Sequence, residues 1–157
     1  MAEKPEIVIP EIAARGVITR LQADDKFPQV LMIQKPSTAE WELPGGRLES
    51  NLDIPKDLAK IIQTEVGIRV NPNSLEDISA YHDGDWLTWT YLLQLLHQTG
   101  PLKVDLDRNQ GVKWFGSNGR RLILESEQDD VLEAKYPIAS GHHKMISDAL
   151  KMIRKVN

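Results

Sequence analysis

The sequence predicts an α/β fold in which a mixed β-sheet lies between helices. Apolar segments with the length and spacing of strands recur along the chain, at 12–21, 30–33, 78–82, 86–96 and 111–115. A helix with recognisable ends interrupts them at 54–66, and an amphipathic helix is expected at 140–156. This order of strands and helices is typical of a layered α/β arrangement.

The first two strands follow from apolar patterning near the start of the chain. Residues up to Pro10 are expected to form a lead-in segment, and 12–21 the first strand. The polar segment 23–28 predicts a turn, and the apolar run 30–33 predicts a buried strand. The segment WELPGG then predicts a short strand that enters a loop, because the Gly45-Gly46 pair permits backbone angles that other residues avoid.

The helix at 54–66 carries signals at both ends. Asp53 is expected to be the N-cap, Pro55 suits the opening turn, and Gly67 suits the C-terminal end. Four side chains fall on one face at helical spacing, namely Leu58, Ile61, Ile62 and Glu65.

A hairpin is expected after this helix. Residues 68–70 predict the start of a strand, and Asn71-Pro72-Asn73 predicts a turn. The segments 78–82 and 86–96 predict two antiparallel strands, with Asp83-Gly84-Asp85 as the turn between them.

The remaining segments are a short strand, an ambiguous stretch and a helix. Residues 111–115 predict the strand, a loop rich in Gly, Ser and Asn follows, and 121–133 is compatible with the start of a helix. His142 and His143, near the start of the last helix, are expected to be exposed to solvent. The apolar positions of that helix repeat at helical spacing: Met145, Ile146, Ala149, Leu150, Met152 and Ile153.

Size and composition exclude several kinds of protein. A chain of 157 residues fits one domain with its own core. A net charge of −4 argues against a surface dedicated to DNA or to an anionic membrane. The absence of cysteine excludes disulfides, Cys-based zinc sites and a Cys nucleophile, and it suits a reducing compartment. With no signal-peptide pattern, the chain is expected to be soluble and cytoplasmic.

The segment GGRLESNLDIPKDLAKIIQTEVGI resembles the Nudix box. The family pattern runs from a glycine to a Glu six residues later, and then over seven residues to Arg-Glu-apolar-any-Glu-Glu-any-Gly-apolar. Placing Gly67-Ile68 at its end puts Gly46 at its start. The preceding WELPGG and the later VKWF are also similar to Nudix proteins. The resemblance implies a Nudix-like α/β/α sandwich.

The resemblance also implies a chemistry. The Nudix box holds Mg²⁺ or Mn²⁺ against a diphosphate, where the metal neutralises charge and activates water. Such hard cations take oxygen ligands. The Glu residues of the box place their carboxylates on one helix face, toward the substrate.

This chain departs from the box at most of those positions. Leu52 stands where the first Glu is expected, Lys60 replaces the Arg, and Ile61 and Thr64 replace the next two Glu residues. Only Glu65 remains. Lys cannot reproduce the bidentate fork of Arg, and Ile61 supplies no ligand. We therefore expect a Nudix fold that hydrolyses poorly.

Two interpretations of the remaining carboxylates stay open. Glu49, Asp57 and Glu65 together form an alternative metal site for Mg²⁺ or Mn²⁺, with Glu65 as the catalytic residue, since Asp57 lies one turn before Ile61 on the same face. In the other interpretation, Glu65 caps or pairs locally, with Lys60 as the candidate partner, and the other two carboxylates are solvated.

Candidate ligand-binding residues lie in and beside the box. Aromatic side chains on the hairpin, Trp86 or Tyr91, are candidates for stacking on a base, although core packing is the commoner role for an aromatic residue. The candidate binding residues are Gly45, Gly46, Arg47, Lys60 and Trp86.

Three functions are compatible with these features. The first is a hydrolysis-deficient Nudix-like protein that binds a nucleotide, another diphosphate-containing ligand or a partner. The second is a metal-dependent hydrolase of a nucleoside diphosphate linked to another moiety. The third is a structural or regulatory subunit, as in a homodimer.

Overall fold

The computed structural model describes residues 11–21, 26–49, 53–95, 111–122, 138–139 and 141–156. Its helices are α1 (Ile54–Val66), α3 (His142–Val156) and the short 3₁₀ helix η1 (Pro72–Ser74). Its strands are β1 (Glu11–Arg20), β2 (Gln29–Gln34), β3 (Trp41–Glu42), β4 (Gly45–Arg47), β5 (Glu76–Asp83), β6 (Trp86–Leu95) and β7 (Gly111–Phe115).

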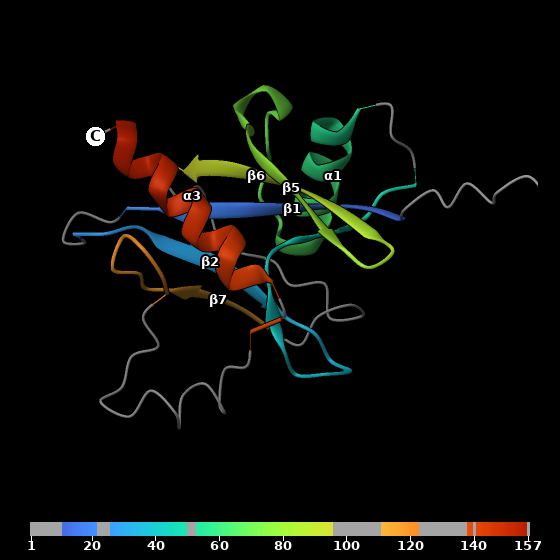
Figure 1. Ribbon diagram of the computed structural model, residues 1–157, viewed down its shortest axis with the longest axis horizontal. Helices are drawn as coiled ribbons and strands as arrows, with labels where there is room; N and C mark the ends of the chain where they lie inside the picture. The colour runs from blue at the N-terminus through green and yellow to red at the C-terminus, as the bar shows by residue number, and fades with distance from the viewer. Residues whose placement is uncertain are drawn as a thin grey trace, which may run out of the picture.

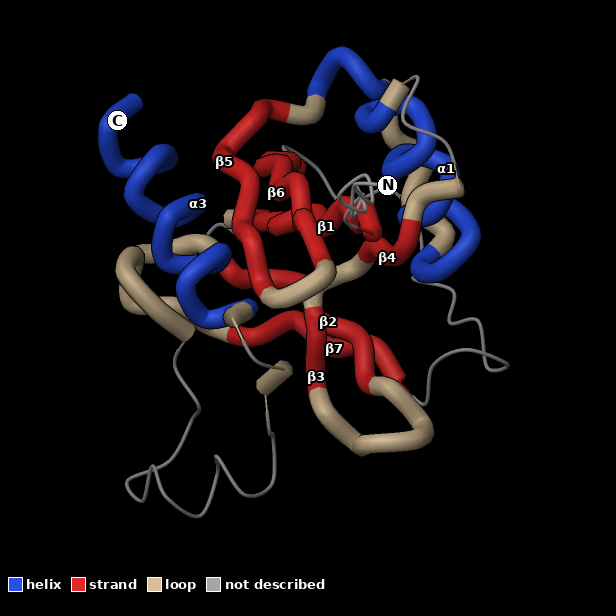
Figure 2. The backbone as a smooth tube through the Cα atoms, turned by 45° about the vertical axis from the view of Figure 1, so that its right-hand side comes forward, coloured by secondary structure: helices blue, strands red, loops and turns tan. Residues whose placement is uncertain are grey.

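The strands form one mixed sheet between the two helices. The strand order is β3-β2-β1-β6-β5, and in addition β4 pairs with β1 and β7 with β2. β1 and β6 run parallel from Glu11↔Trp86 to Arg20↔Leu95, whereas the other pairs are antiparallel. Figures 1 and 2 show α1 on one side of the strands and α3 on the other. The predicted α/β/α sandwich with a mixed sheet is therefore confirmed.

Each face of the sheet has its own hydrophobic core. Along β2, Val30 and Met32 point to the core under α3, and Leu31 and Ile33 point to the core under α1. This alternation follows from the two-residue repeat of a strand. A strand that is buried on both faces has a continuous apolar sequence, which is why the run at 30–33 predicted it correctly.

Helix α1 has the predicted bounds because its ends are set by local chemistry. The Asp53 carboxylate accepts a hydrogen bond from the Lys56 backbone N–H at 3.2 Å. At the other end Gly67 has a left-handed backbone (φ 75°), and its N–H donates to the Gln63 carbonyl at 2.9 Å. The predicted hairpin is also confirmed, as β5 and β6.

The strand expected at 68–70 is wrong. Residues 67–71 have no regular structure and lead into η1, where the Asn71 side chain accepts from the Asn73 N–H at 3.0 Å. The chain turns there before it reaches a partner strand, and pairing begins only at Glu76↔Leu92. Helix α3 begins at His142, one residue after Gly141. The predicted lead-in 1–10 lies outside the described residues, as does all of the ambiguous segment 121–133 except its first two residues. Those two are not helical, and Leu122 forms an isolated β-bridge with Ser117.

His142 differs from its expected exposure. Only 7% of it is accessible, and its Nδ1 accepts a hydrogen bond from the Leu43 backbone N–H at 3.0 Å. His143, the next residue, is exposed as expected. The start of α3 packs against the segment that precedes Gly45, so one side chain of the pair faces inward. None of the described helices is long and apolar enough to cross a membrane.

The burial of His142 predicts a loss of stability in acid. Burial, with a smaller effect of the Arg15 charge, lowers the pKa of His142 from 6.5 to about 3. The unfolded chain therefore binds one more proton between these pH values. We expect the contribution of His142 to the free energy of unfolding to be fully present above pH 6.5. Below that pH the free energy of unfolding should fall by at most about 1.4 kcal/mol per pH unit.

Urea unfolding of the wild type and of His142→Asn, at pH 7 and pH 5, tests this expectation. Asparagine offers a carbonyl oxygen near the position of Nδ1 but does not titrate. The variant should lose about 2 kcal/mol less than the wild type between the two pH values. Equal losses would show that His142 is not held neutral in the fold.

Candidate functional site

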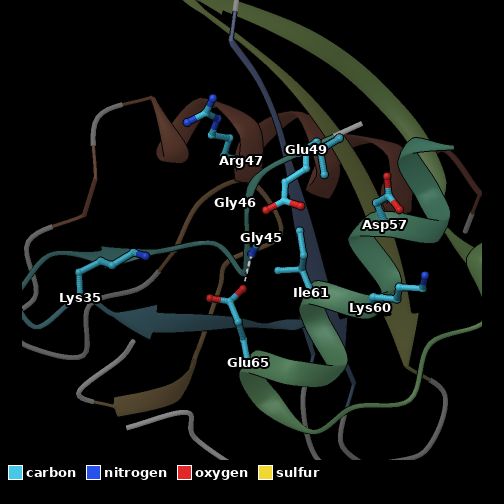
Figure 3. Close-up of a pocket in the computed structure, with 10 residues that line it drawn as sticks. Lys35, Gly45, Gly46, Arg47, Glu49, Asp57, Lys60, Ile61 and Glu65 are labelled. Atoms are coloured by element: carbon cyan, nitrogen blue, oxygen red, sulfur yellow. Dashed lines mark hydrogen bonds between the residues drawn. The ribbon is translucent and has the colours of Figure 1, made fainter. Parts of the chain in front are cut away.

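A pocket of about 650 Å³ lies between β4 and the face of α1 that bears the box residues (Figure 3). We call it the box pocket. Strand β4 forms one wall because it pairs with β1, with Ala14 opposite Gly46 and Arg15 opposite Gly45. Its lining residues are Lys35, Gly45, Gly46, Arg47, Leu48, Glu49, Asp57, Lys60, Ile61 and Glu65. Seven of the eight candidate site residues are therefore brought together.

The two glycines of the pocket differ in whether their positions leave room for a Cβ atom. Gly45 has φ +140°, and a Cβ built there would lie 2.0 Å from the Ala14 carbonyl oxygen. Only glycine allows β4 to approach β1 this closely. A Cβ on Gly46 would meet nothing within 4 Å. The close approach of the backbone therefore depends on Gly45, whereas Gly46 leaves open space in the wall.

Glu65 joins α1 to β4. It is buried, with 2% of its surface accessible, and its Oε1 accepts a hydrogen bond from the Gly45 backbone N–H at 2.8 Å (Figure 3). The partner is thus a backbone group of the pocket wall. Figure 3 shows Lys60 pointing away from Glu65. This hydrogen bond ties Glu65 to the pocket wall, whereas Lys60 was the local partner considered from the sequence.

This role predicts that an acceptor matters more than a charge at position 65. Glu65→Ala leaves the buried Gly45 N–H without its partner and should destabilise the protein by about 2 kcal/mol. Glu65→Gln keeps a carbonyl oxygen and should cost about 1 kcal/mol or less. Thermal and urea unfolding of both variants measure the difference. Equal costs would contradict the importance of this hydrogen bond.

The face of α1 in the pocket carries an apolar residue between two acidic ones. Asp57, Ile61 and Glu65 follow each other at four-residue intervals, and all line the box pocket. In Figure 3 the Ile61 side chain points into the pocket toward Glu49. Thr64 does not line the pocket, and its hydroxyl donates to the Lys60 carbonyl at 3.0 Å. Leu52 lies outside the described residues.

The carboxylates of the pocket do not converge on one point. Glu49, Asp57 and Glu65 come from the loop after β4 and from two turns of α1. Among the residues that the structure describes, no group of three or more His, Asp or Glu side chains is placed to hold a metal ion. The carboxylates as they lie therefore do not fit the Mg²⁺ or Mn²⁺ site that the family implies.

Positive charge borders the pocket on several sides. Arg47 and Lys60 were expected from the sequence, and Lys35 adds a third cation. Lys35 Nζ lies 3.4 Å from Glu42 Oε1, and Arg47 Nε lies 3.0 Å from Glu11 Oε2 in a largely exposed pair. The exposed pair of Arg47 with Glu11 is weak, so an anionic ligand can compete for Arg47. Lys35 was missed because only the pairing of β2 and β3 brings it to the pocket.

Trp86 lies in a second pocket, of about 490 Å³, on the α3 side of the sheet. We call it the hairpin pocket. It is lined by Ala13, Arg15, Arg47, Tyr81, His82, Trp86, Thr88, Gly141, His142, Lys144 and Met145. Trp86 pairs with Glu11 at the outer end of β1, beyond the level of β4, and is 42% exposed. Tyr91, the other aromatic candidate, is buried in the core under α1.

A part-buried ion pair ties the hairpin pocket to β3. Arg15 of the hairpin pocket donates to Glu42 Oε1 and to the Leu43 carbonyl oxygen, both at 2.9 Å. Glu42 also faces Lys35 of the box pocket. Glu42 therefore pairs with one cation that lines each pocket.

Sheet order, box helix and pocket together define the Nudix class of fold. No family model matches the chain. A Nudix hydrolase of Bacillus subtilis, YvcI, is 32% identical over 79 residues, which cover 46% of this chain and 48% of that protein. The similarity to this Nudix hydrolase covers about half of the chain, and the matched part spans about half the length of this curated relative.

Solved structures agree on the fold. A MutT/nudix family protein of Enterococcus faecalis has a TM-score of 0.78 at 23% identity, covering 98% of this chain and 66% of that one. The Nudix domain of NrtR from Shewanella oneidensis, solved in complex with ADP-ribose, has a TM-score of 0.67 at 18% identity, covering 92% and 88%. Both similarities show that this chain has the Nudix fold.

Proposed function

We propose that this chain is a Nudix-fold protein that binds a nucleotide or another diphosphate-containing ligand in the box pocket and hydrolyses it poorly or not at all. One observation carries the proposal. The pocket is open and bordered by cations, but Ile61 occupies the position of a box Glu and Glu65 is hydrogen-bonded to the pocket wall.

Charge and shape support binding. A pocket of about 650 Å³ is within the range of small-ligand sites. Lys35, Arg47 and Lys60 complement the negative charge of a diphosphate, and Gly46 leaves room for an approach to the backbone. The Nudix domain of NrtR is complexed with ADP-ribose, which contains such a diphosphate. This makes ADP-ribose a suitable first probe.

Two lysines on α1 provide a matched test of binding. Both are exposed, but Lys60 lines the box pocket and Lys56 does not. Lys60→Ala should weaken ADP-ribose binding about three- to tenfold, and Lys56→Ala should leave it unchanged. Isothermal titration calorimetry without divalent metal measures both, and the wild-type affinity should fall with added salt.

The results separate the three functions. No binding of ADP-ribose or pyrophosphate by the wild type would contradict a diphosphate pocket and favour a structural role. Binding only with Mg²⁺ or Mn²⁺, abolished by Glu65→Gln, would favour the hydrolase built on Glu65 with Glu49 or Asp57. Metal-independent binding that responds to Lys60 supports the proposal.

A further inference from the structure

A third pocket, of about 720 Å³, lies toward the other end of β1 from the box pocket. We call it the distal pocket. It lies where the last residues of β1 and β6 meet the segment before β2 and the C-terminal half of α3 (Figure 1). β4 pairs with β1 at residues 13–15, whereas the distal pocket begins at Thr19. None of the described residues that line it lines the box pocket or the hairpin pocket, so it is a separate site.

The described lining of the distal pocket is mostly apolar. Leu150 and Ile153 line it and belong to the core under α3, so the pocket opens onto that core. Leu21 and Phe27 also line it, and they are 57% and 37% exposed. They are two of the three exposed large hydrophobic side chains in the described part of the chain. Apolar surface gathered in one open pocket gains free energy when an apolar group covers it.

The wall that carries Phe27 is held in place by the segment after β7. The Ser117 hydroxyl donates a hydrogen bond to the Pro28 carbonyl oxygen. Gly119 has φ +84°, and a Cβ built there would lie 2.8 Å from Phe27 Cδ1. Glycine takes this backbone angle without strain and leaves room for the ring. Phe27 is therefore packed in position although it is partly exposed.

The charged residues in the described lining are both basic. The Arg20 guanidinium lies 4.3 Å from the Trp114 ring centroid, and its Nε donates to Gln29 Oε1 at 2.7 Å. Lys26 is exposed, and its Nζ lies 5.5 Å from the centroid of the Phe27 ring. An accessible positive charge thus lies beside the apolar lining. This combination favours a ligand with an apolar body and a negative charge.

We propose that the distal pocket binds a free fatty acid of medium chain length, with its alkyl chain against Leu150 and Ile153 and its carboxylate beside Lys26. A volume of about 720 Å³ is within the range of small-ligand sites. An exposed lysine matches the single negative charge of a carboxylate. An alkyl chain can follow the apolar lining because it needs no polar partner. This site goes beyond the proposed function, since it involves neither the box pocket nor a diphosphate.

The chain length and the charge of the ligand test this proposal. Hexanoate, octanoate, decanoate and decyltrimethylammonium are titrated calorimetrically into the full chain, below the concentrations at which they form micelles. Each buried methylene should tighten binding about two- to fourfold, so decanoate should bind at least about tenfold more tightly than hexanoate. Decyltrimethylammonium has the same alkyl chain and the opposite charge, and it should bind at least about tenfold more weakly than decanoate.

Two substitutions of Leu21 locate the binding site. Leu21 follows the last residue of β1 and is largely exposed, so Leu21→Asp and Leu21→Lys should both fold. Both remove the same apolar side chain, but they bring opposite charges to the pocket. Decanoate should bind Leu21→Lys at least about tenfold more tightly than Leu21→Asp. Lys26→Ala should weaken binding about three- to tenfold, whereas Lys56→Ala on α1, outside the pocket, should have no effect.

Three results would overturn the proposal. Affinity that does not depend on chain length, or that is equal for decanoate and decyltrimethylammonium, would show adsorption without a site. Equal binding of decanoate by the two Leu21 variants would place it elsewhere on the protein. Binding to phosphatidylglycerol vesicles without binding of decanoate would make this face a membrane contact. Affinity that follows chain length, the charge at position 21 and Lys26 supports the proposed site.

Discussion

Replacing Gly45 with alanine is expected to destabilise the protein by about 3 kcal/mol or more. The new Cβ would lie 2.0 Å from the Ala14 carbonyl oxygen and 2.9 Å from Arg15 Cα. Both atoms belong to the backbone of the central strand β1, so neither can move without breaking the pairing of β4 with β1. The Gly45 N–H would also move away from Glu65. Urea unfolding measures the decrease in the free energy of unfolding. Because β4 forms one wall of the box pocket, the variant should also lose that wall.

The adjacent glycine is the matched control for this expectation. A Cβ on Gly46 meets nothing within 4 Å, so Gly46→Ala should cost less than about 1 kcal/mol. It should nevertheless narrow the pocket and weaken binding of a diphosphate. Equal destabilisation by the two variants would show that the close pairing of β4 with β1 is not what requires glycine.

Restoring one carboxylate to the box is expected to create metal binding. Ile61→Glu places an acidic side chain between Asp57 and Glu65 on the pocket face of α1. Three acidic residues at four-residue spacing then border the pocket, in addition to Glu49. We expect the variant to bind Mn²⁺ at least about tenfold more tightly than the wild type, because hard cations gain from each added carboxylate. Calorimetry and the thermal shift with Mn²⁺ measure this gain.

Thr64→Glu separates a local effect from a change in net charge. It adds the same charge to the same helix at a position that does not line the pocket. It should therefore leave Mn²⁺ affinity near that of the wild type. If the wild type already binds Mn²⁺ as tightly as Ile61→Glu, Ile61 is not what prevents a metal site.

Features set by local chemistry were predictable from the sequence. The Asp53 cap, Pro55 and Gly67 gave α1 its bounds, because each acts within one turn of the helix end. The hairpin followed from two apolar segments around a turn. The strand at 30–33 followed from its continuous apolar run, and together these elements predicted the fold class.

Features set by long-range pairing were not predictable in this way. The hydrogen bond between Leu43 and His142 joins residues that are 99 positions apart. The residues next to His142 in the sequence therefore predicted an exposed side chain, whereas the fold buries it. Segment 68–70 has the composition of a strand but no partner in the described part of the chain. Trp86 shares a hairpin with residues near the site, yet the register of β6 against β1 places it in the other pocket.

Among the box residues, some features follow from local helix geometry and others from long-range packing. Sequence spacing correctly placed Ile61 and Glu65 on the pocket face, because a helix fixes that periodicity. It could not indicate that Glu65 would bond to the Gly45 N–H, since this contact depends on how α1 packs against β4. In the described part of the chain, Glu49, Asp57 and Glu65 do not form a group placed to hold a metal ion.

The most direct test of the central claim is to follow ADP-ribose with the wild type in Mg²⁺ and in Mn²⁺, measuring binding and release of AMP in the same samples. We expect saturable binding and no turnover above that of buffer, with the same result for Glu65→Gln. Metal-dependent release of AMP by the wild type that Glu65→Gln abolishes would contradict the account and make this chain a hydrolase with a rebuilt site.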